Sequence, residues 1–279
     1  MKKINICLIK QDNYIHSYAF LELAELIYFS LKDLGFEVRL VFNQINPDVK
    51  NILIGCHLLD PKFIGQVPKS TIIFNTEQIY NDPTDWNKNI FVWATNFEVW
   101  DYSIRNIEKL KEMRVNRAKH FKIGFQRELV RLDKLKKKDV DVLFYGSINE
   151  RRKNILEKLI AKGLMVKTLF GVYGKERDGW IERSKLVLNH HFYNSRGFEI
   201  VRVFYLLTNS VAVVSEVNES ISIDTMYRQG IYAVNYDDLV AGCVELIEHD
   251  PVRQRIQVEA LNSISKYPQK LFTQEVLDS

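Results

Sequence analysis

The chain has 279 residues, a net charge of +4 and a hydrophobic fraction of 46%, which suits one large domain or two of roughly 130 residues each. The mild positive excess is not the concentrated basic footprint of a dedicated nucleic-acid-binding protein. No apolar stretch approaches transmembrane length and the first residues do not form a signal peptide, so we expect a cytoplasmic protein. Three widely separated cysteines without a CxxC pair predict buried, reduced thiols.

The first half of the chain alternates between apolar runs of strand length and segments with helical spacing. Apolar runs bounded by glycine or polar residues predict strands at 4–9, 36–42, 51–55, 70–75, 90–95 and 120–125. Helical spacing predicts a helix at 18–34 and another that ends at Lys111. The βαβ opening lacks a GxGxxG turn, so a dinucleotide-binding fingerprint is absent from this half.

The second half restarts the same alternation after a lysine-rich segment at 134–138, which is typical of a solvated linker. We therefore predict two domains, 1–138 and 139–279, the second with its last helix packing back on the first. Two such series predict the α/β class, with two Rossmann-like domains facing a cleft. Strands are expected at 140–145, 166–170, 186–189, 211–215 and 231–234, and helices after residue 149 and at 176–184, 198–207, 236–249 and 252–266.

The segment around Gly146 has the features of a phosphate site. A buried strand runs into Gly146 and Ser147, and a helix with a basic first turn begins after Asn149. Backbone N–H groups at a helix N-terminus attract anions, and arginine chelates phosphate oxygens. Arg151 and Arg152 are unfavourable at this position because their charges oppose the helix dipole, and a bound anion would explain their presence. The interpretation is a diphosphate site, and a solvated basic turn is the alternative.

Several stretches together form a wider pattern. They are 144–147 with Arg151 and Arg152, 170–174, 187–189 with 191–193, 198–202, 212–216 and, in the first half, 99–103 with Asn106. This pattern resembles GT-B glycosyltransferases that build bacterial surface polysaccharide and lipopolysaccharide. The resemblance implies GT-B architecture, with a nucleotide-sugar donor bound to the second domain and a glycan or lipid-linked glycan as the acceptor.

The resemblance also implies site residues. Glu199 matches the glutamate that contacts the transferred sugar in that family. Retaining members carry a second glutamate further along the same helix, but residues 203–206 include no acid. The implied donor-binding residues are Gly146, Ser147, Asn149, Arg151, Arg152, Gly171, Tyr173, Gly174, Asn189, His191 and Arg202. A non-catalytic nucleotide- or sugar-binding module of the same fold is the alternative function.

Arg202 lies one helical turn after Glu199, on the same face of the expected helix. The two residues either hold the donor or form a structural ion pair. If they and Arg152 serve a ligand, substitution of Arg152 or Glu199 should barely change the stability of the fold.

An inverting transfer also needs a general base in the first half of the chain. Residues with suitable chemistry follow expected strands at the edge where parallel sheets bind ligands. The candidates are His16, Asp12, Glu77 and Asp101. Asp101 is alternatively the N-cap of the helix that follows it.

Two features suggest a metal, but neither is persuasive. His190 and His191 are adjacent at a strand end and so point to opposite faces, and no HExxH or Cys/His cluster is present. The acids Asp139 and Asp141 form a DxD triplet, but they lie at the start of a strand. We therefore predict no metal and no cofactor apart from the donor itself. Lysines at 2–3 and 134–138 predict peripheral contact with the inner face of an anionic membrane, and no nucleic-acid partner is expected.

Overall fold

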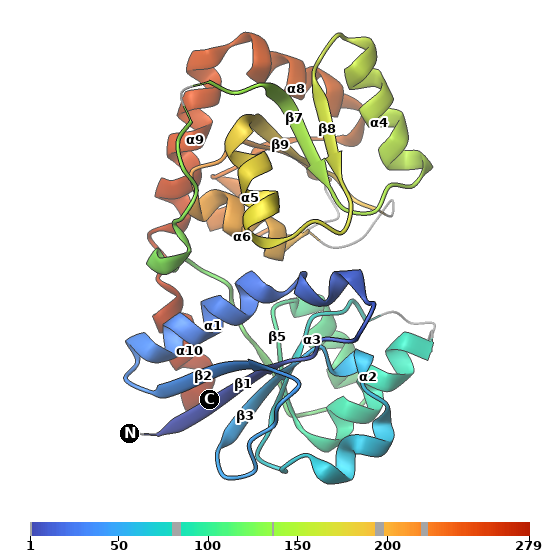
Figure 1. Ribbon diagram of the computed structural model, residues 1–279, viewed down its shortest axis with the longest axis vertical. Coiled ribbons are helices and arrows are strands. Elements are labelled where there is room, and N and C mark those ends of the chain that lie inside the picture. The colour runs from blue at the N-terminus through green and yellow to red at the C-terminus, as the bar shows by residue number, and fades with distance from the viewer. Residues whose placement is uncertain (1, 80–84, 136, 193–197, 219–222) are drawn as a thin grey trace. The chain divides into compact units, whose positions relative to one another are not determined.

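The computed structural model describes residues 2–79, 85–135, 137–192, 198–218 and 223–279, which form two compact α/β units (Figure 1). Unit 1 contains residues 1–123 and 269–279, and unit 2 contains residues 124–268. The division therefore lies before the lysine-rich segment. Residues 124–138 go with unit 2 because Asn209 fixes their backbone: its Oδ1 accepts from the N–H groups of Arg131 at 2.8 Å and Leu132 at 3.0 Å.

Unit 1 is built on a six-stranded parallel sheet with strand order β2-β1-β3-β4-β5-β6. Its strands are β1 (Lys3–Leu8), β2 (Glu37–Phe42), β3 (Lys50–Ile54), β4 (Ile72–Asn75), β5 (Glu98–Asp101) and β6 (Ala118–His120). Its helices are α1 (Leu21–Asp33), α2 (Asp85–Asn96), α3 (Ile104–Glu112) and α10 (Gln269–Asp278), with short 3-10 turns η1 (Ile15–Tyr18), η2 (Cys56–Leu58) and η3 (Pro61–Gln66).

Four elements of unit 1 differ from the sequence-based expectation, namely α2, β5, β6 and α10, and no strand was predicted at 98–101. The strand predicted at 90–95 is wrong, because these residues form part of helix α2. The buried side chains here are Ile90, Trp93, Ala94 and Phe97, a helical spacing that the run of β-forming residues obscured. The last strand is also displaced, since β6 covers 118–120 and not 120–125.

The chain ends in a helix, α10, that was not predicted. The helix expected to be last, at 252–266, belongs to unit 2, whereas α10 packs against α1 of unit 1. The Thr273 hydroxyl donates to Ser30 Oγ at 2.8 Å, and Gln269 Nε2 donates to the Lys122 carbonyl at 3.0 Å. These buried polar contacts fix the chain end on the first unit.

Unit 2 contains a five-stranded parallel sheet with strand order β11-β10-β9-β7-β8. Its strands are β7 (Val140–Tyr145), β8 (Val166–Leu169), β9 (Ser184–Asn189), β10 (Val213–Glu216) and β11 (Tyr232–Val234). Its helices are α4 (Glu150–Ala161), α5 (Gly174–Arg183), α6 (Ile200–Thr208), α7 (Thr225–Arg228), α8 (Leu239–Glu248) and α9 (Asp250–Ile264), with 3-10 turns η4 (Arg127–Leu129) and η5 (Tyr236–Asp238).

Each sheet has its own apolar core. In unit 2, aliphatic residues of the central strands pack against α4 and α8 around Phe144, Leu159 and Leu246. The three cysteines are free and buried, and desolvation raises the pKa of Cys7 to about 11, so it carries a neutral thiol. Among the helices of the described residues, none has both the length and the apolar character needed to cross a membrane.

Candidate functional site

The turn between β7 and α4 brings the backbone close to two arginines. Gly146 has φ +131°, a conformation that side-chain-bearing residues rarely adopt. A Cβ on Gly146 would lie 3.1 Å from Arg202 Nη2 and 3.6 Å from Arg152 Nη1. Asn149 then N-caps α4, because its Oδ1 accepts from the backbone N–H of Arg152 at 3.0 Å. Glycine and asparagine thus place the first turn of α4 against the guanidinium groups.

Arg152 is the most heavily bonded residue of the site. Its side chain is buried, with Nε and Nη2 donating to the His190 carbonyl at 3.2 and 2.7 Å. Nη1 donates to the Ser147 carbonyl at 2.9 Å, and Nη2 donates to Glu199 Oε1 at 2.6 Å. Burial lowers the pKa of Arg152 and the Glu199 carboxylate opposes this effect, so the guanidinium remains charged beside its partner. A solvated basic turn does not describe this residue.

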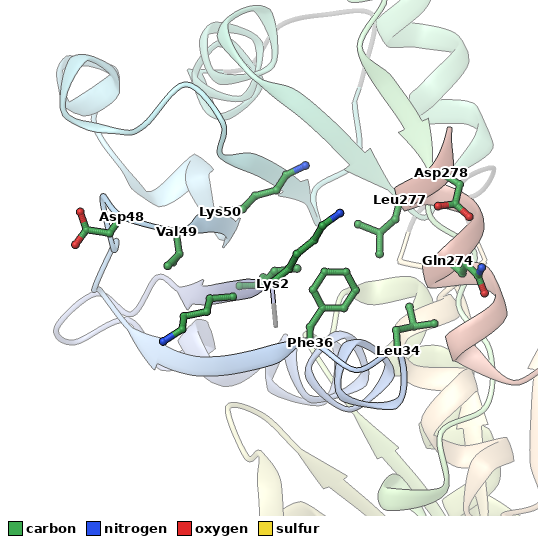
Figure 2. A pocket seen from close by; sticks show the side chains of 11 residues that line it. Lys2, Leu34, Phe36, Asp48, Val49, Lys50, Gln274, Leu277 and Asp278 are labelled. Atoms are coloured by element: carbon green, nitrogen blue, oxygen red, sulfur yellow. The ribbon is translucent and has the colours of Figure 1, made fainter.

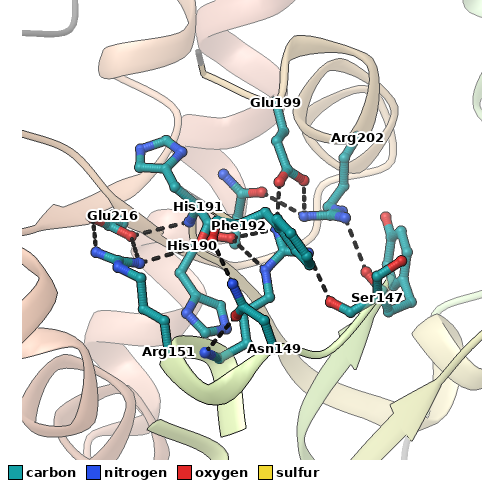
Figure 3. A network of polar contacts seen from close by, with 12 residues as sticks. Ser147, Asn149, Arg151, His190, His191, Phe192, Glu199, Arg202 and Glu216 are labelled. Carbon is teal, nitrogen blue, oxygen red and sulfur yellow. Dashed lines mark hydrogen bonds and ion pairs between the residues drawn. The ribbon is translucent and has the colours of Figure 1, made fainter. Parts of the chain in front are cut away.

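Arg202 approaches the same carboxylate from helix α6. It forms an ion pair with Glu199 Oε2, donates through Nη1 to Asn189 Oδ1 at 2.8 Å, and donates through Nη2 to the Tyr145 carbonyl at 2.9 Å. Glu199 therefore bridges the two arginines, each on its own oxygen (Figure 3). The ion pair that was one interpretation of the sequence is present, and it extends from Glu199 and Arg202 of α6 to Arg152 of α4, so it joins two helices.

Arg151 is held separately, by Glu216 at the end of β10. Nη1 and Nη2 donate to the two carboxylate oxygens at 2.8 and 2.6 Å, a bidentate pair in which the Glu216 side chain is buried. The guanidinium lies 3.8 Å from the ring centroid of Tyr236, and the His191 N–H donates to Glu216 Oε2 at 3.0 Å. Glu216 and Tyr236 were not predicted as site residues. Their positions at the carboxyl edge of the sheet are a signal that could have found them, since Glu216 ends β10 and Tyr236 follows β11.

His190 and His191 are buried without hydrogen bonds from their rings. Within the described residues, neither ring nitrogen of either histidine has a partner. Desolvation, followed by the Arg152 and Arg202 charges, lowers the pKa of His190 to about 2, and desolvation also lowers the pKa of His191. The two rings point to opposite sides of the chain (Figure 3). Both imidazoles are thus neutral and buried.

The other implied donor residues adjoin this cluster. The Gly146 N–H donates to the Leu169 carbonyl at 3.0 Å, so the loop with Gly171, Tyr173 and Gly174 begins beside the β7 turn. Gly171 and Gly174 have positive φ angles of 69° and 56°, and Tyr173 occupies the N-cap position of α5. Tyr193, part of the pattern used above, lies outside the described residues.

The DxD triplet and the metal interpretation find no support in the site. Asp139 and Asp141 lie at the amino end of β7 and pair with surface cations, Arg183 Nε at 2.9 Å and Lys185 Nζ at 2.7 Å respectively. In the described part of the chain, no group of three His, Cys, Asp or Glu residues is arranged to hold a metal ion. In the lysine-rich segment, Lys134 and Lys137 are exposed as expected, whereas Lys138 Nζ donates to the carbonyls of Glu182 and Ser184.

Unit 1 carries a second polar cluster, centred on Asp101 at the end of β5. The Asp101 carboxylate is fully buried and accepts from Asn75 Nδ2 at 2.6 Å, Asn106 Nδ2 at 2.9 Å and the Ser103 N–H at 2.7 Å. The N-cap interpretation of Asp101 is wrong, since Ser103 caps α3 through its hydroxyl. Both asparagines also donate to the Glu77 carbonyl, so Asp101 orients the loop after β4.

The burial of Asp101 predicts a distinctive pH dependence of stability. Desolvation, opposed by the Asn75, Ser103 and Asn106 donors, raises its pKa from 3.8 to about 7. Between these values the folded protein binds more protons than the unfolded chain, so the contribution of Asp101 to stability is lost as pH rises from about 4 to about 7. We expect the free energy of unfolding of the wild type, relative to Asp101→Asn, to fall by a few kcal/mol over this range.

Urea unfolding of both proteins at several pH values measures this difference. Burial lowers the pKa of His57 to about 4, which acts in the opposite direction in both proteins and cancels in the comparison. Parallel pH profiles for the wild type and Asp101→Asn would show that Asp101 does not titrate in this range.

The remaining base candidates lie around the loop after β4. Glu77 is partly exposed, with Oε1 at 3.4 Å from His57 Nε2. Because the lowered pKa of His57 keeps its ring neutral at pH 7, this contact is not an ion pair there. Tyr14 links Glu77 to His16: desolvation and then the Glu77 charge raise its pKa, and its ring lies edge-on to His16 with centroids 5.5 Å apart. Asp12 is exposed in the loop after β1.

A separate cavity of about 740 Å³ opens at the other end of the unit 1 sheet (Figure 2). Its lining residues include Lys2, Phe36 and Lys50, at the amino ends of β1, β2 and β3, and Leu277 on α10. The candidate residues of unit 1 follow the carboxyl ends of its strands. This cavity is therefore distinct from the polar cluster.

Comparison with known proteins gives relatives in sequence without a described activity. No family model matches the chain. Two proteins of Acanthamoeba polyphaga mimivirus are similar: uncharacterised protein L140 is 27% identical over 269 residues, covering 90% of this chain and 81% of L140. Uncharacterised protein L137 is 27% identical over 221 residues, covering 75% of this chain and 29% of L137, so the chain spans less than a third of that relative.

Solved structures share the whole architecture at low sequence identity. T4 phage β-glucosyltransferase, in complex with UDP-glucose, matches with a TM-score of 0.59 and 15% identity over 100% of this chain and 98% of its own. Sucrose-phosphate synthase from Thermosynechococcus elongatus matches with a TM-score of 0.64 and 9% identity, over 100% of this chain and 98% of its own. HepE from Anabaena, in complex with UDP, matches with a TM-score of 0.60 and 12% identity, over 100% of this chain and 99% of its own. The predicted α/β class with two Rossmann-like, parallel-sheet domains of the GT-B type is thereby confirmed.

Proposed function

We propose that the chain is a glycosyltransferase that moves a sugar from a nucleotide-sugar donor, of the UDP class, to a glycan or lipid-linked glycan. The observation that carries the proposal is the cluster of Arg151, Arg152 and Arg202 at the carboxyl edge of the unit 2 sheet. It lies in a fold whose solved examples, T4 phage β-glucosyltransferase and HepE, were crystallised with UDP-glucose and with UDP. Ligands bind at this edge of open parallel sheets.

The cluster has the charge that a departing nucleoside diphosphate needs. Three guanidinium groups face the carboxylates of Glu199 and Glu216, which leaves an excess of one positive charge. The N-terminus of α4, reached through Gly146, adds backbone donors and the positive end of the helix dipole. Preorganised donors of this kind stabilise the charge that develops on the leaving phosphate. In this proposal Glu199 meets the donor sugar, and His191, Asn189 and the 171–174 loop contact the rest of the donor.

Unit 1 supplies the general base in this proposal. We assign that role to Glu77, with His16 as the other candidate and Asp101 as a positioning residue that fixes the Glu77 loop through Asn75 and Asn106. A partly exposed carboxylate that a neutral His57 contacts can take a proton from an acceptor hydroxyl. The absence of an acid at 203–206 supports the inverting route, which requires such a base.

A donor screen tests the proposal directly. Melting temperatures with UDP-, GDP-, dTDP- and CMP-sugars should rise for the correct donor, because a ligand at ~100 times its Kd stabilises the folded protein by about 2.7 kcal/mol. We expect the rise with UDP-sugars. An absence of any shift with all four classes, together with no binding by calorimetry, would contradict the proposal.

Turnover separates the enzyme from a non-catalytic binding module of the same fold. Nucleotide release that depends on an acceptor identifies the enzyme, and tight donor binding without release identifies the module.

T4 phage β-glucosyltransferase has been crystallised with UDP and Mn²⁺, and it is described as a DNA-modifying enzyme. The assay is therefore run with EDTA and with Mn²⁺, and with glycan, lipid-linked glycan on anionic vesicles, and duplex DNA as acceptors. We propose activity in EDTA with a glycan-type acceptor, and contact of the lysine-rich segments with the vesicles.

A further inference from the structure

Glu199 occupies an unusual position at the start of α6. It is the N-cap residue of this helix, yet its side chain makes no capping hydrogen bond. The carboxylate instead reaches Arg152 through Oε1 at 2.6 Å and pairs with Arg202 through Oε2. One oxygen on each of two guanidinium groups is also the arrangement in which arginines hold a phosphate.

The surroundings of this carboxylate hold polar atoms that the protein itself does not satisfy. Among the described residues, Arg202 Nε and all four ring nitrogens of His190 and His191 are buried without a hydrogen-bond partner. His190 and His191 are 0% and 1% exposed, and the charges of Arg151 and Arg152 act on both rings. Buried polar atoms without partners are costly and therefore uncommon in finished sites. Arg202 Nε is one of these atoms, and it belongs to a guanidinium that already holds Glu199, which indicates that a polar ligand completes this part of the cluster.

We propose that the Glu199 carboxylate is an internal substitute for the diphosphate of the donor. When a nucleoside diphosphate binds, its phosphate oxygens take the place of the carboxylate between Arg152 and Arg202, and Glu199 is released toward the sugar. This inference rests on the proposed function. It adds that Arg152 and Arg202 are paired with negative charge in both the empty and the occupied site, so the two arginines stay ordered without ligand and every binding event must displace Glu199.

The displacement has a measurable consequence, because an internal competitor weakens binding. Removing the charge should strengthen it: Glu199→Gln is expected to bind UDP and inorganic pyrophosphate on the order of tenfold more tightly than the wild type by calorimetry. The matched control is Glu150→Gln, which removes one exposed negative charge from the first turn of α4. Its affinity should change by less than about twofold, as expected for a screened surface charge.

The outcomes separate the inference from the proposed function. Tighter binding of UDP by Glu199→Gln, but not by Glu150→Gln, supports the inference. Binding of UDP by Glu199→Gln when the wild type shows none also supports it. Binding of UDP by the wild type that is unchanged or weakened in Glu199→Gln overturns the inference and leaves the function standing. If neither protein binds UDP or pyrophosphate, both fail.

A second measurement uses the wild type and does not depend on the folding of a variant. In a crystal structure of the wild type with UDP, phosphate oxygens should contact Arg152 and Arg202, and the Glu199 carboxylate should have left them. UDP bound elsewhere, with Glu199 still bridging the two arginines, would overturn the inference.

Discussion

The Arg152→Ala variant is expected to lower the free energy of unfolding by about 3–5 kcal/mol, the usual cost of removing one partner of a buried ion pair. Arg152 is 3% exposed and makes four hydrogen bonds: two with the His190 carbonyl, one with the Ser147 carbonyl and one with Glu199. Truncation to alanine removes the donor, while the acceptors stay buried and do not regain hydrogen bonds to water. Urea unfolding at pH 7, followed by circular dichroism, measures the change.

The neighbouring residue provides the matched control. Lys153 is on the same helix, its side chain is 52% exposed, and its Nζ lies 3.9 Å from Glu157. Such exposed pairs contribute little, so Lys153→Ala should change the free energy of unfolding by less than about 0.5 kcal/mol. If Arg152→Ala and Lys153→Ala change the free energy of unfolding by equally small amounts, the buried contacts of Arg152 do not stabilise the fold. Arg152 would then be held in place only by a ligand.

This expectation reverses the one drawn from sequence, and the reason is physical. Basic residues in the first turn of α4 indicated an anion, because arginine there opposes the helix dipole. The sequence could not show that Glu199 and Glu216, which are 47 and 65 residues further along the chain, supply that negative charge. A pattern along the chain identifies the need for an anion, but only the folded sheet shows which groups meet it.

Elements whose local sequence pattern agrees with their tertiary packing were predicted well. Strand β7 has the predicted bounds, because a run that is apolar apart from Asp141 ends at Tyr145 and is followed directly by a glycine. Helix α2 was mistaken for a strand because Ile90 to Thr95 are mostly β-forming residues, and tertiary packing of Trp93 and Phe97 overrode that preference. Helix α10 escaped notice because it is short and has a weak apolar stripe, so its stability depends on packing against α1.

The candidate site shows the same division. Gly146, Asn149, Arg152 and Glu199 were singled out from sequence, and the structure brings them together within hydrogen-bond or close-contact distance. The buried state of Asp101 was not foreseen, because its three donors come from β4, from α3 and from the turn before α3. The bond from Asn75 spans 26 residues, and side-chain hydrogen bonds of this kind leave no periodicity that a sequence could reveal.

The assignment of the base therefore turns on which carboxylate of unit 1 can reach an acceptor. Asp101 is fully buried and its oxygens are occupied by three donors, whereas the Glu77 side chain is 27% exposed. Geometry precedes pKa in the choice of a general base, since the group must touch the proton that it removes. Glu77 is accessible in this sense, so in the proposal it acts as the base and Asp101 acts through the loop that carries Glu77.

We accordingly expect Glu77→Gln to reduce turnover by about 10²–10⁴-fold, the range for loss of a general base. Nucleotide release is measured with the donor and acceptor found in the screen, and Kd for UDP should stay within about twofold because the arginine cluster lies in unit 2. The control is Glu98→Gln, which has similar exposure at 29% but lies at the amino end of β5, where it contacts Lys119. Full activity in Glu77→Gln, with activity lost in His16→Asn, would transfer the role of base to His16.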